Sequence, residues 1–152
     1  MKLKSVRIQN FRSCDDSGEF SIDGTTCLVG KNEAGKTAIL QALETLNSSE
    51  ASNNKYDKLR DYPRRYLNEY KERHGDSEAV VATTKWLLDD DDRAAVEAEF
   101  GVGCLPTETI TAKKSYESAE TIWTTYFDES KAIAHLINEA NFDAIEKAVV
   151  DK

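Results

Sequence analysis

The stretch CLVGKNEAGKTAILQAL, residues 27–43, passes from an apolar piece through a turn bracketed by two glycines into a piece rich in alanine and leucine. Its centre, GKNEAGKT at residues 30–37, matches the pattern G-x-x-x-x-G-K-[ST] at every position. The apolar residues before the turn predict a strand, and the 3.6-residue periodicity of residues 38–46 predicts a helix. That helix is expected to place four apolar side chains on one face: Ile39, Leu40, Leu43 and Leu46.

The turn has the composition of a phosphate-binding loop, or P-loop. Its two glycines let the backbone wrap round a phosphate without Cβ clashes, so that successive N–H groups and the positive end of the helix converge on the anion. In this hypothesis Lys36 is the catalytic group that bridges the β- and γ-phosphates of ATP, and the Thr37 hydroxyl ligates Mg²⁺. The expected nucleotide-binding residues are Gly30, Lys31, Asn32, Glu33, Ala34, Gly35, Lys36 and Thr37.

The composition bounds the other possibilities. A chain of 152 residues with 39% hydrophobic and 32% charged residues suits one globular domain. The net charge of -8 argues against a surface that binds polyanions all over. No stretch approaches the roughly 20 apolar residues of a membrane span, and the N-terminus lacks the apolar core of a signal peptide, so we expect a cytoplasmic protein with no membrane partner. Three widely spaced cysteines and two histidines predict neither disulfides nor structural zinc.

The chain is expected to have three parts, residues 1–47, 48–75 and 76–152. The first part should hold strands at residues 2–11 and 18–30, the P-loop and the first helix. The second follows the polar cluster NSSEASNN and should be helical after Pro63, ending at Gly75. The third should hold four elements: a strand at 78–88, a short helix ending at Gly101, a hairpin over 108–128, and a helix from 129 to the terminus.

The segments LKSVRIQNFRSC (3–14) and IDGTTCLVGKNEAGKTAILQALETLN (22–47) together resemble the start of the ABC-type ATPases of DNA repair and chromosome maintenance. This group includes the SMC, RecF and RecN proteins and the overcoming-lysogenization-defect (OLD) nucleases. The box Asn10-Phe11-Arg12-Ser13 and the filling Asn32-Glu33-Ala34 carry the resemblance. Further on, DYPRR and WLLDDDDRAAVEAEFG look most like OLD-type AAA ATPases, which carry a downstream Toprim nuclease domain.

The resemblance implies an α/β fold: a P-loop NTPase forming the N-terminal lobe of an ABC-type ATPase head, with antiparallel strands beside the P-loop strand and flanking helices. It also implies a nucleotide-dependent dimer with a second head, and it places Arg12 near the nucleotide or DNA. The alternative for Arg12 is a surface ion pair. In such heads the second lobe carries an LSGGQ-like signature, a Walker B aspartate with its glutamate, and a switch histidine. The sequence contains none of these, so it resembles the N-terminal part of a longer protein, and independent catalysis is not expected.

Two acidic clusters look like a Walker B motif. KWLLDDDD and TYFDES each place acids after apolar residues, whereas a Walker B aspartate follows a buried strand and faces Mg²⁺. The polar residues within both segments are typical of half-exposed antiparallel strands. We therefore expect Asp89 to Asp92, and likewise Asp128 and Glu129, to cap the helices that follow them.

Residues 55–73 form a locally basic segment. Seven basic and four acidic side chains give it a charge of +3, and Tyr62, Tyr66 and Tyr70 recur at helical spacing. Basic and aromatic groups together are compatible with DNA binding, for which Arg60, Arg64 and Arg65 are the candidates. A tyrosine face packed on the domain with solvated charges around it is the favoured alternative.

The sequence thus predicts ATP binding, and in a full-length parent ATP hydrolysis coupled to DNA repair, DNA processing or phage defence. Two alternatives remain open. The chain could be a self-contained small P-loop NTPase or kinase that uses Asp89 and Asp90 as its Walker B acids. It could also be a non-catalytic interaction module gated by nucleotide.

Overall fold

A computed structural model describes residues 1–31, 35–46 and 54–140 of the chain. It divides into two compact units, which are treated separately. The sheet unit comprises residues 2–86 and 111–124, and the helical unit comprises Met1, residues 87–110 and the chain from residue 125 onward. None of the helices in the described ranges has the length and apolar character needed to cross a membrane.

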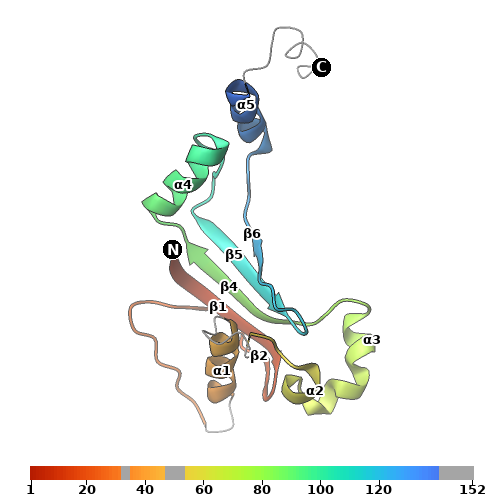
Figure 1. Ribbon diagram of the computed structural model, residues 1–152. Coiled ribbons are helices and arrows are strands. Elements are labelled where there is room, and N and C mark those ends of the chain that lie inside the picture. Colours follow the sequence, from red (N-terminus) through yellow and green to blue (C-terminus); the bar gives the residue numbers. More distant parts are fainter. Residues whose placement is uncertain (32–34, 47–53, 141–152) are drawn as a thin grey trace. The chain divides into compact units, whose positions relative to one another are not determined.

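One sheet supplies the strands of the fold (Figure 1). Its path runs β2-β1-β4-β5-β6, and β3 also pairs with β1. Both β2 and β3 are antiparallel to β1, and β6 is antiparallel to β5. The expected first strand, the expected strand at 78–88 and the expected hairpin are all confirmed. The bounds are Lys2–Phe11 for β1, Cys14–Asp16 for β2, Phe20–Ser21 for β3, Val80–Leu87 for β4, Thr109–Ser115 for β5 and Ile122–Thr124 for β6.

The prediction of a strand directly before the P-loop is wrong. Of residues 18–30, only the two residues of β3 are paired, and the segment TTCLV at residues 25–29 lies outside every strand. Val29 in this segment is 86% exposed. A β-rich segment becomes a strand only when another strand satisfies its backbone N–H and C=O groups, and the described residues supply no such neighbour here.

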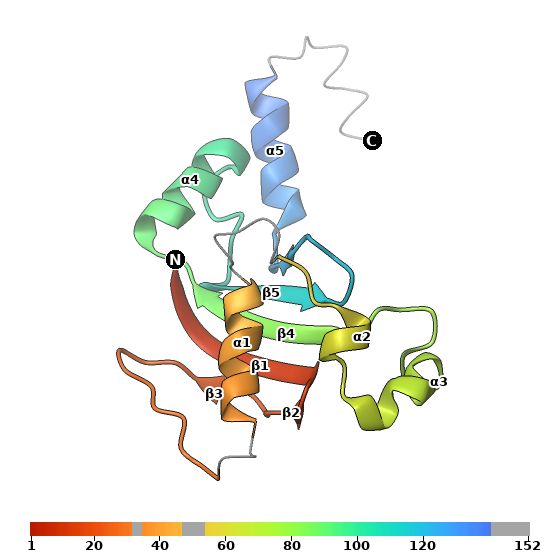
Figure 2. The ribbon, with the colours of Figure 1, turned by 60° about the horizontal axis from the view of Figure 1, so that its bottom comes forward.

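Helix α1, Lys36–Leu46, lies across one face of the sheet, over β1 and β4 (Figure 2). Ala38, Ile39 and Ala42 are its buried residues. The small alanines let the helix approach the sheet closely, so the buried stripe is narrower than the leucine pattern suggested. Leu40, expected on the buried face, is 59% exposed, and that expectation is wrong.

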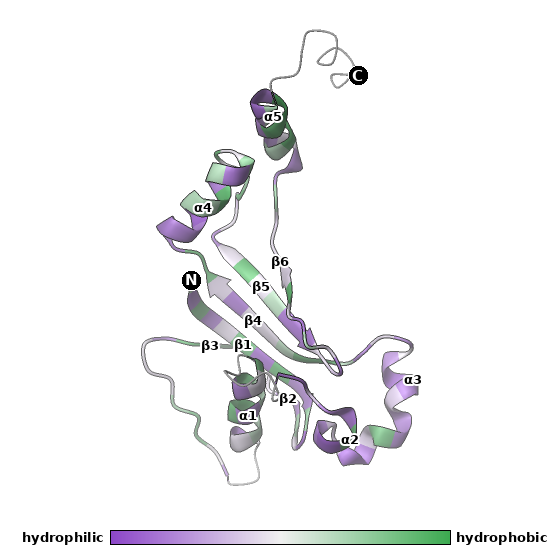
Figure 3. Cartoon of the chain, in the orientation of Figure 1, coloured by the Kyte–Doolittle hydropathy of each residue, from purple (hydrophilic) through white to green (hydrophobic). Residues whose placement is uncertain are grey.

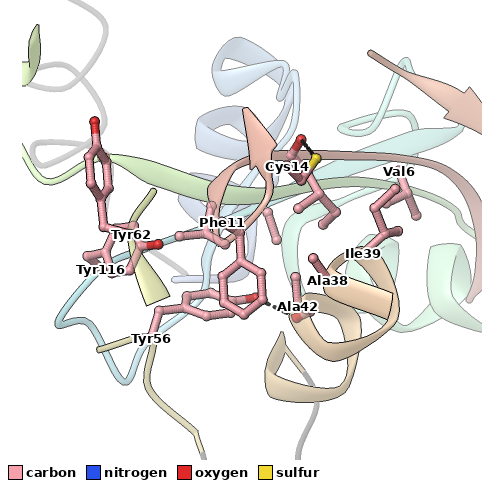
Figure 4. Close-up of a cluster of buried hydrophobic side chains, with 13 residues drawn as sticks. Val6, Phe11, Cys14, Ala38, Ile39, Ala42, Tyr56, Tyr62 and Tyr116 are labelled. Atoms are coloured by element: carbon pink, nitrogen blue, oxygen red, sulfur yellow. Dashed lines mark hydrogen bonds between the residues drawn. The ribbon is translucent and has the colours of Figure 1, made fainter. Parts of the chain in front are cut away.

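Buried aromatic rings fill one end of this core (Figure 4). Phe11, Tyr56, Tyr62 and Tyr116 are each no more than 1% exposed, and their rings meet edge to face. A buried tyrosine hydroxyl needs a hydrogen-bond acceptor. Tyr56 donates to the Ala42 carbonyl of α1 at 2.7 Å, and Tyr116 donates to the Asn10 carbonyl at 2.6 Å. The hydroxyls therefore tie separate elements of the core together.

The basic segment forms three short helices: α2 (Lys58–Asp61), the 3-10 helix η2 (Arg64–Glu69) and α3 (Tyr70–His74). The chain is helical after Pro63 and the helix ends at Gly75, as expected. The six residues that follow Pro63 form a 3-10 helix, however, and not an α-helix. Gly75 has a φ of 63°, the left-handed value that glycine adopts readily. Figure 3 shows that α2 and α3 carry mainly hydrophilic residues.

The helical unit contains α4 (Asp90–Phe100) and α5 (Glu129–Glu139). Its small core is formed by Cys104, Leu105 and Ala132. The short helix ends at Gly101, as the sequence indicated. The last helix was expected to reach the terminus, but residues 141–152 lie outside the described part of the chain.

Candidate functional site

The candidate P-loop leads into the N-terminus of α1 in the sheet unit. Gly30 and Lys31 precede the turn, Gly35 ends it, and Lys36 is the first residue of the helix. Three of the expected contact residues, Asn32, Glu33 and Ala34, lie outside the described residues. The free N–H groups at the start of α1 therefore follow the glycine turn directly, as a phosphate-binding loop requires.

The Lys36 side chain reaches back to residues 30 and 31. Its ammonium donates to the Gly30 carbonyl at 2.6 Å and to the Lys31 carbonyl at 2.5 Å. An ammonium carries three donors, so it can bridge the two sides of the loop and still approach a phosphate oxygen. Lys36 is the first residue of α1, and in P-loop proteins the lysine at the start of this helix contacts the terminal phosphates.

Gly35 is held in a left-handed conformation with a φ of 79°. A Cβ built on it would lie 3.5 Å from the Cys14 Cβ and 3.6 Å from the Ser13 Oγ. Gly35 therefore packs against the turn between β1 and β2, which is the NFRS box of the sequence. Cys14 is buried there, and its thiol donates to the Ile8 carbonyl at 3.5 Å. Burial raises the pKa of that thiol, so it packs as a small apolar side chain.

Thr37 is exposed in the first turn of α1. A single hydroxyl suits Mg²⁺, which takes few protein ligands and completes its octahedron with phosphate oxygens and water. In the described ranges, no group of three or more histidine, cysteine, aspartate or glutamate residues is placed to hold a metal ion.

Arg12 forms an ion pair, as the alternative reading expected. Its guanidinium donates to Asp61 Oδ1 from Nε at 3.0 Å and from Nη2 at 2.9 Å, and to Gln41 Oε1 on α1 at 2.5 Å. Its backbone N–H donates to the Asp61 carbonyl at 2.6 Å. Arg12 also has a positive φ of 51°, which is uncommon for a residue with a side chain. The NFRS turn is therefore fastened to both α2 and α1.

Asp61 is the buried acid that receives these bonds. Its side chain is 2% exposed, and Arg60 reaches it as well, with Nη2 3.1 Å from Oδ2. Burial alone would raise the pKa of this carboxyl, but the hydrogen bonds from Arg60 and Arg12 outweigh burial, so the pKa lies below its ordinary value. Asp61 is therefore an ionised carboxylate held between two guanidinium groups.

The two acidic clusters cap helices, as expected. Asp89 accepts from the backbone N–H of Asp92, and Asp92 accepts from that of Asp89, which forms a capping box at the start of α4. The N-terminal ammonium contacts Asp89 Oδ2 at 2.7 Å and lowers the pKa of that carboxyl to about 2. Asp128 caps α5 by accepting from Lys131. These roles account for both clusters without Walker B chemistry.

The tyrosines of the basic segment pack on the domain. Tyr62 is 1% exposed and its hydroxyl lies 2.9 Å from His74 Nε2, while the Tyr70 hydroxyl accepts from the Ala79 backbone. Tyr66 lies beneath two guanidinium groups, those of Arg65 at 4.7 Å and Arg73 at 3.9 Å. The structural alternative for this segment is thus confirmed for Tyr62 and Tyr70.

Cys14, Cys27 and Cys104 are free thiols. The sequence did not indicate Cys14, which packs against Gly35, or Gln41 and Asp61, which bind Arg12. The NFRS box pointed to the turn, but nothing local to Asp61 distinguishes it from the other acids of a charged segment.

The motif G-x-x-x-x-G-K-[ST] at the start of a helix, on an α/β framework, is typical of P-loop nucleotide-binding proteins. A family model described as an AAA ATPase domain matches residues 1–148, so the chain belongs to that family. The expectation of a P-loop ATPase is thereby confirmed at this level. No curated protein and no solved structure matches the chain.

Proposed function

We propose that the chain binds ATP with Mg²⁺ through Gly30–Thr37 and acts as the N-terminal lobe of an ABC-type ATPase head. The position of Lys36 supports the proposal, because its ammonium contacts the carbonyls of Gly30 and Lys31 at the N-terminus of α1. In this proposal Lys36 contacts the terminal phosphates, the loop N–H groups hold them, and Thr37 supplies one oxygen to Mg²⁺.

The second lobe would supply what the described residues lack. Phosphoryl transfer needs a group that positions the attacking water and charges that close over the γ-phosphate. The acids that could have served, Asp89 and Asp128, are helix caps. The unpaired segment at residues 25–29 also supports the proposal, since its sequence favours a strand for which a second lobe would provide the neighbour.

The proposed biology is ATP-driven DNA repair, DNA processing or phage defence, with a Toprim nuclease following in the parent and a second head as the dimer partner. Of the candidate DNA contacts, Arg60 is bound to Asp61 and Arg65 to Asp15. Arg64 is exposed on η2, and we assign any contact of this segment with a DNA phosphate to it.

The test is nucleotide binding by the wild-type chain, by Lys36→Ala and by a control. Lys113→Ala removes an exposed lysine from β5 and serves as that control. Mg-ATP and Mg-ADP should raise the melting temperature of the wild type and of the control, since a ligand bound only by the folded state stabilises it by about 2.7 kcal/mol at a hundredfold excess over Kd. Lys36→Ala should lose the shift while keeping its fold.

Absence of any shift in the wild type at several millimolar nucleotide would refute a competent site. Hydrolysis separates the alternatives. The proposal expects no turnover above background from this chain alone. Multiple turnover that is lost in Asp89→Asn or Asp90→Asn would favour the self-contained enzyme.

A further inference from the structure

Asp61 stands out because it is a buried carboxylate that contacts no proposed ligand. It is the last residue of the four-residue helix α2 and is 2% exposed. Burying a carboxylate is costly unless charged partners and hydrogen bonds compensate for the lost hydration. The compensation comes from Arg12 and Arg60, which bind opposite oxygens of the carboxylate through their Nη2 atoms.

Only one of these two arginines also contacts the helix that begins at the proposed nucleotide site. The Arg60 side chain is 67% exposed, and its side-chain hydrogen bonds in the described part of the chain all go to Asp61. Arg12 binds Asp61 on one side and Gln41 of α1 on the other. Gln41 lies in the helix whose first residue is Lys36. The side-chain contacts therefore run from α2 through the NFRS turn to the P-loop helix.

The backbone completes the connection. The Arg12 N–H is held by the Asp61 carbonyl, and the next two residues, Ser13 and Cys14, lie beneath Gly35. Positive φ values at both Asn10 and Arg12 show that this turn has a backbone that the surrounding contacts must maintain. A change in how Arg12 is held would thus move Ser13 and Cys14, against which Gly35 packs.

We propose that Asp61 is a positioning residue for the nucleotide site, which it fixes through Arg12, the NFRS turn and Gln41. This inference rests on the proposed function, because it names the group that holds the proposed loop in its binding geometry. Asp61 itself touches no nucleotide. It neutralises Arg12 and orients its guanidinium, so that Gly35 and α1 are held in place before the ligand arrives.

A positioning role and a purely structural role for Asp61 differ in what they predict for nucleotide affinity. If Asp61 served stability alone, its loss would lower the melting temperature but leave Kd unchanged in molecules that are still folded. A positioning role requires that Kd rise as well, in measurements made well below the melting temperature. Small displacements of positioned groups have large effects on site chemistry, and we expect a rise in Kd of about tenfold.

The experiment compares Asp61→Asn with Arg60→Gln by calorimetric titration with Mg-ADP. Asp61→Asn removes the charge that binds both arginines, whereas Arg60→Gln removes only the Arg60 pair and leaves the Arg12 contacts with Asp61 and Gln41 in place. Asp61→Asn should raise Kd about tenfold, and Arg60→Gln should leave Kd within about twofold of the wild type. Gln41→Ala removes the contact between Arg12 and α1, and it should raise Kd as Asp61→Asn does. It decides the matter if Asp61→Asn does not fold.

Each outcome has a distinct meaning. The positioning role is overturned if Asp61→Asn binds Mg-ADP with the wild-type Kd. If Asp61→Asn is unfolded, an unchanged Kd in Gln41→Ala overturns it instead. In both cases the proposed function stands as long as the wild type binds and Lys36→Ala does not. Equal rises in Kd for Asp61→Asn and Arg60→Gln also overturn it, because only Arg12 continues to α1. Absence of binding by the folded wild type overturns the proposed function and this inference together.

Discussion

Replacing Gly35 with alanine separates the stability of the loop from its proposed function. Gly35 has a φ of 79°, and forcing a residue with a Cβ into the left-handed region costs roughly 1–2 kcal/mol. The added Cβ would lie 3.5–3.7 Å from Ser13 and Cys14, which are ordinary contacts, so no steric term adds to this cost. Since folded domains are stable by about 5–15 kcal/mol, Gly35→Ala should fold.

Binding should suffer more than stability does. Relaxation of residue 35 toward negative φ would turn the loop N–H groups away from a phosphate, and a hydrogen bond to a charged group contributes about 1.5–3 kcal/mol. Since each 1.4 kcal/mol is about a factor of ten, loss of one such bond weakens nucleotide binding roughly ten- to a hundredfold.

Gly18→Ala is the matched control. Gly18 has a φ of 65° and nothing lies within 4 Å of its Cβ position, so the backbone cost is similar but the loop is untouched. Both variants should melt roughly 2–8 °C below the wild type by circular dichroism. Calorimetric titration with Mg-ADP should show weakened binding in Gly35→Ala alone. Equal affinities in the two variants would refute the argument that the conformation of Gly35 holds the phosphate site.

Two further predictions concern the helical unit. Gly101→Ala should destabilise the fold by roughly 2–6 kcal/mol, because backbone strain at a φ of 91° adds to the clash of a Cβ only 2.7 Å from the His135 Cβ. In Gly103→Ala the added Cβ meets only the flexible end of Lys131, so this variant should have a higher melting temperature than Gly101→Ala. Equal melting temperatures would contradict this reasoning. Asp89→Ala should lower the melting temperature at pH 7 more than Asp90→Ala. The ammonium of Met1 lowers the pKa of Asp89 to about 2 in the folded state. The ionised Asp89 carboxylate therefore contributes stability above pH about 4, and this contribution is lost as the pH falls toward 2. A difference in melting temperature between the two variants that is undiminished near pH 2 would refute the assignment.

Local signals predicted the elements that local interactions build. The helix α4 was expected because aspartates precede it and Gly101 ends it, and the structure shows a capping box and a glycine terminus at these positions. Strand β4 and the hairpin followed from β-branched and aromatic residues near turn-forming residues. The glycines and Lys36 identified the candidate site because that chemistry depends on a short, contiguous stretch.

Features that depend on distant residues could not be predicted in the same way. The segment at 25–29 has a strand composition, but strand formation needs a neighbour that its own sequence does not encode. The periodicity of α1 marked Leu40 as a core position, whereas the alanine face packs on the sheet. Asp61 acquires its role only through Arg12, 49 positions earlier in the chain, so no local pattern could identify it.

The hydrogen bond between the Tyr116 hydroxyl and the Asn10 carbonyl joins residues that are 106 positions apart. Contacts of such long sequence separation form late, because a long loop must close before they are made. During synthesis, the NFRS turn therefore leaves the ribosome long before the residue that anchors it. Until Tyr116 arrives, the apolar faces of β1 and α1 have an incomplete core to pack against, and the nascent chain is most open to aggregation or chaperone binding in that interval.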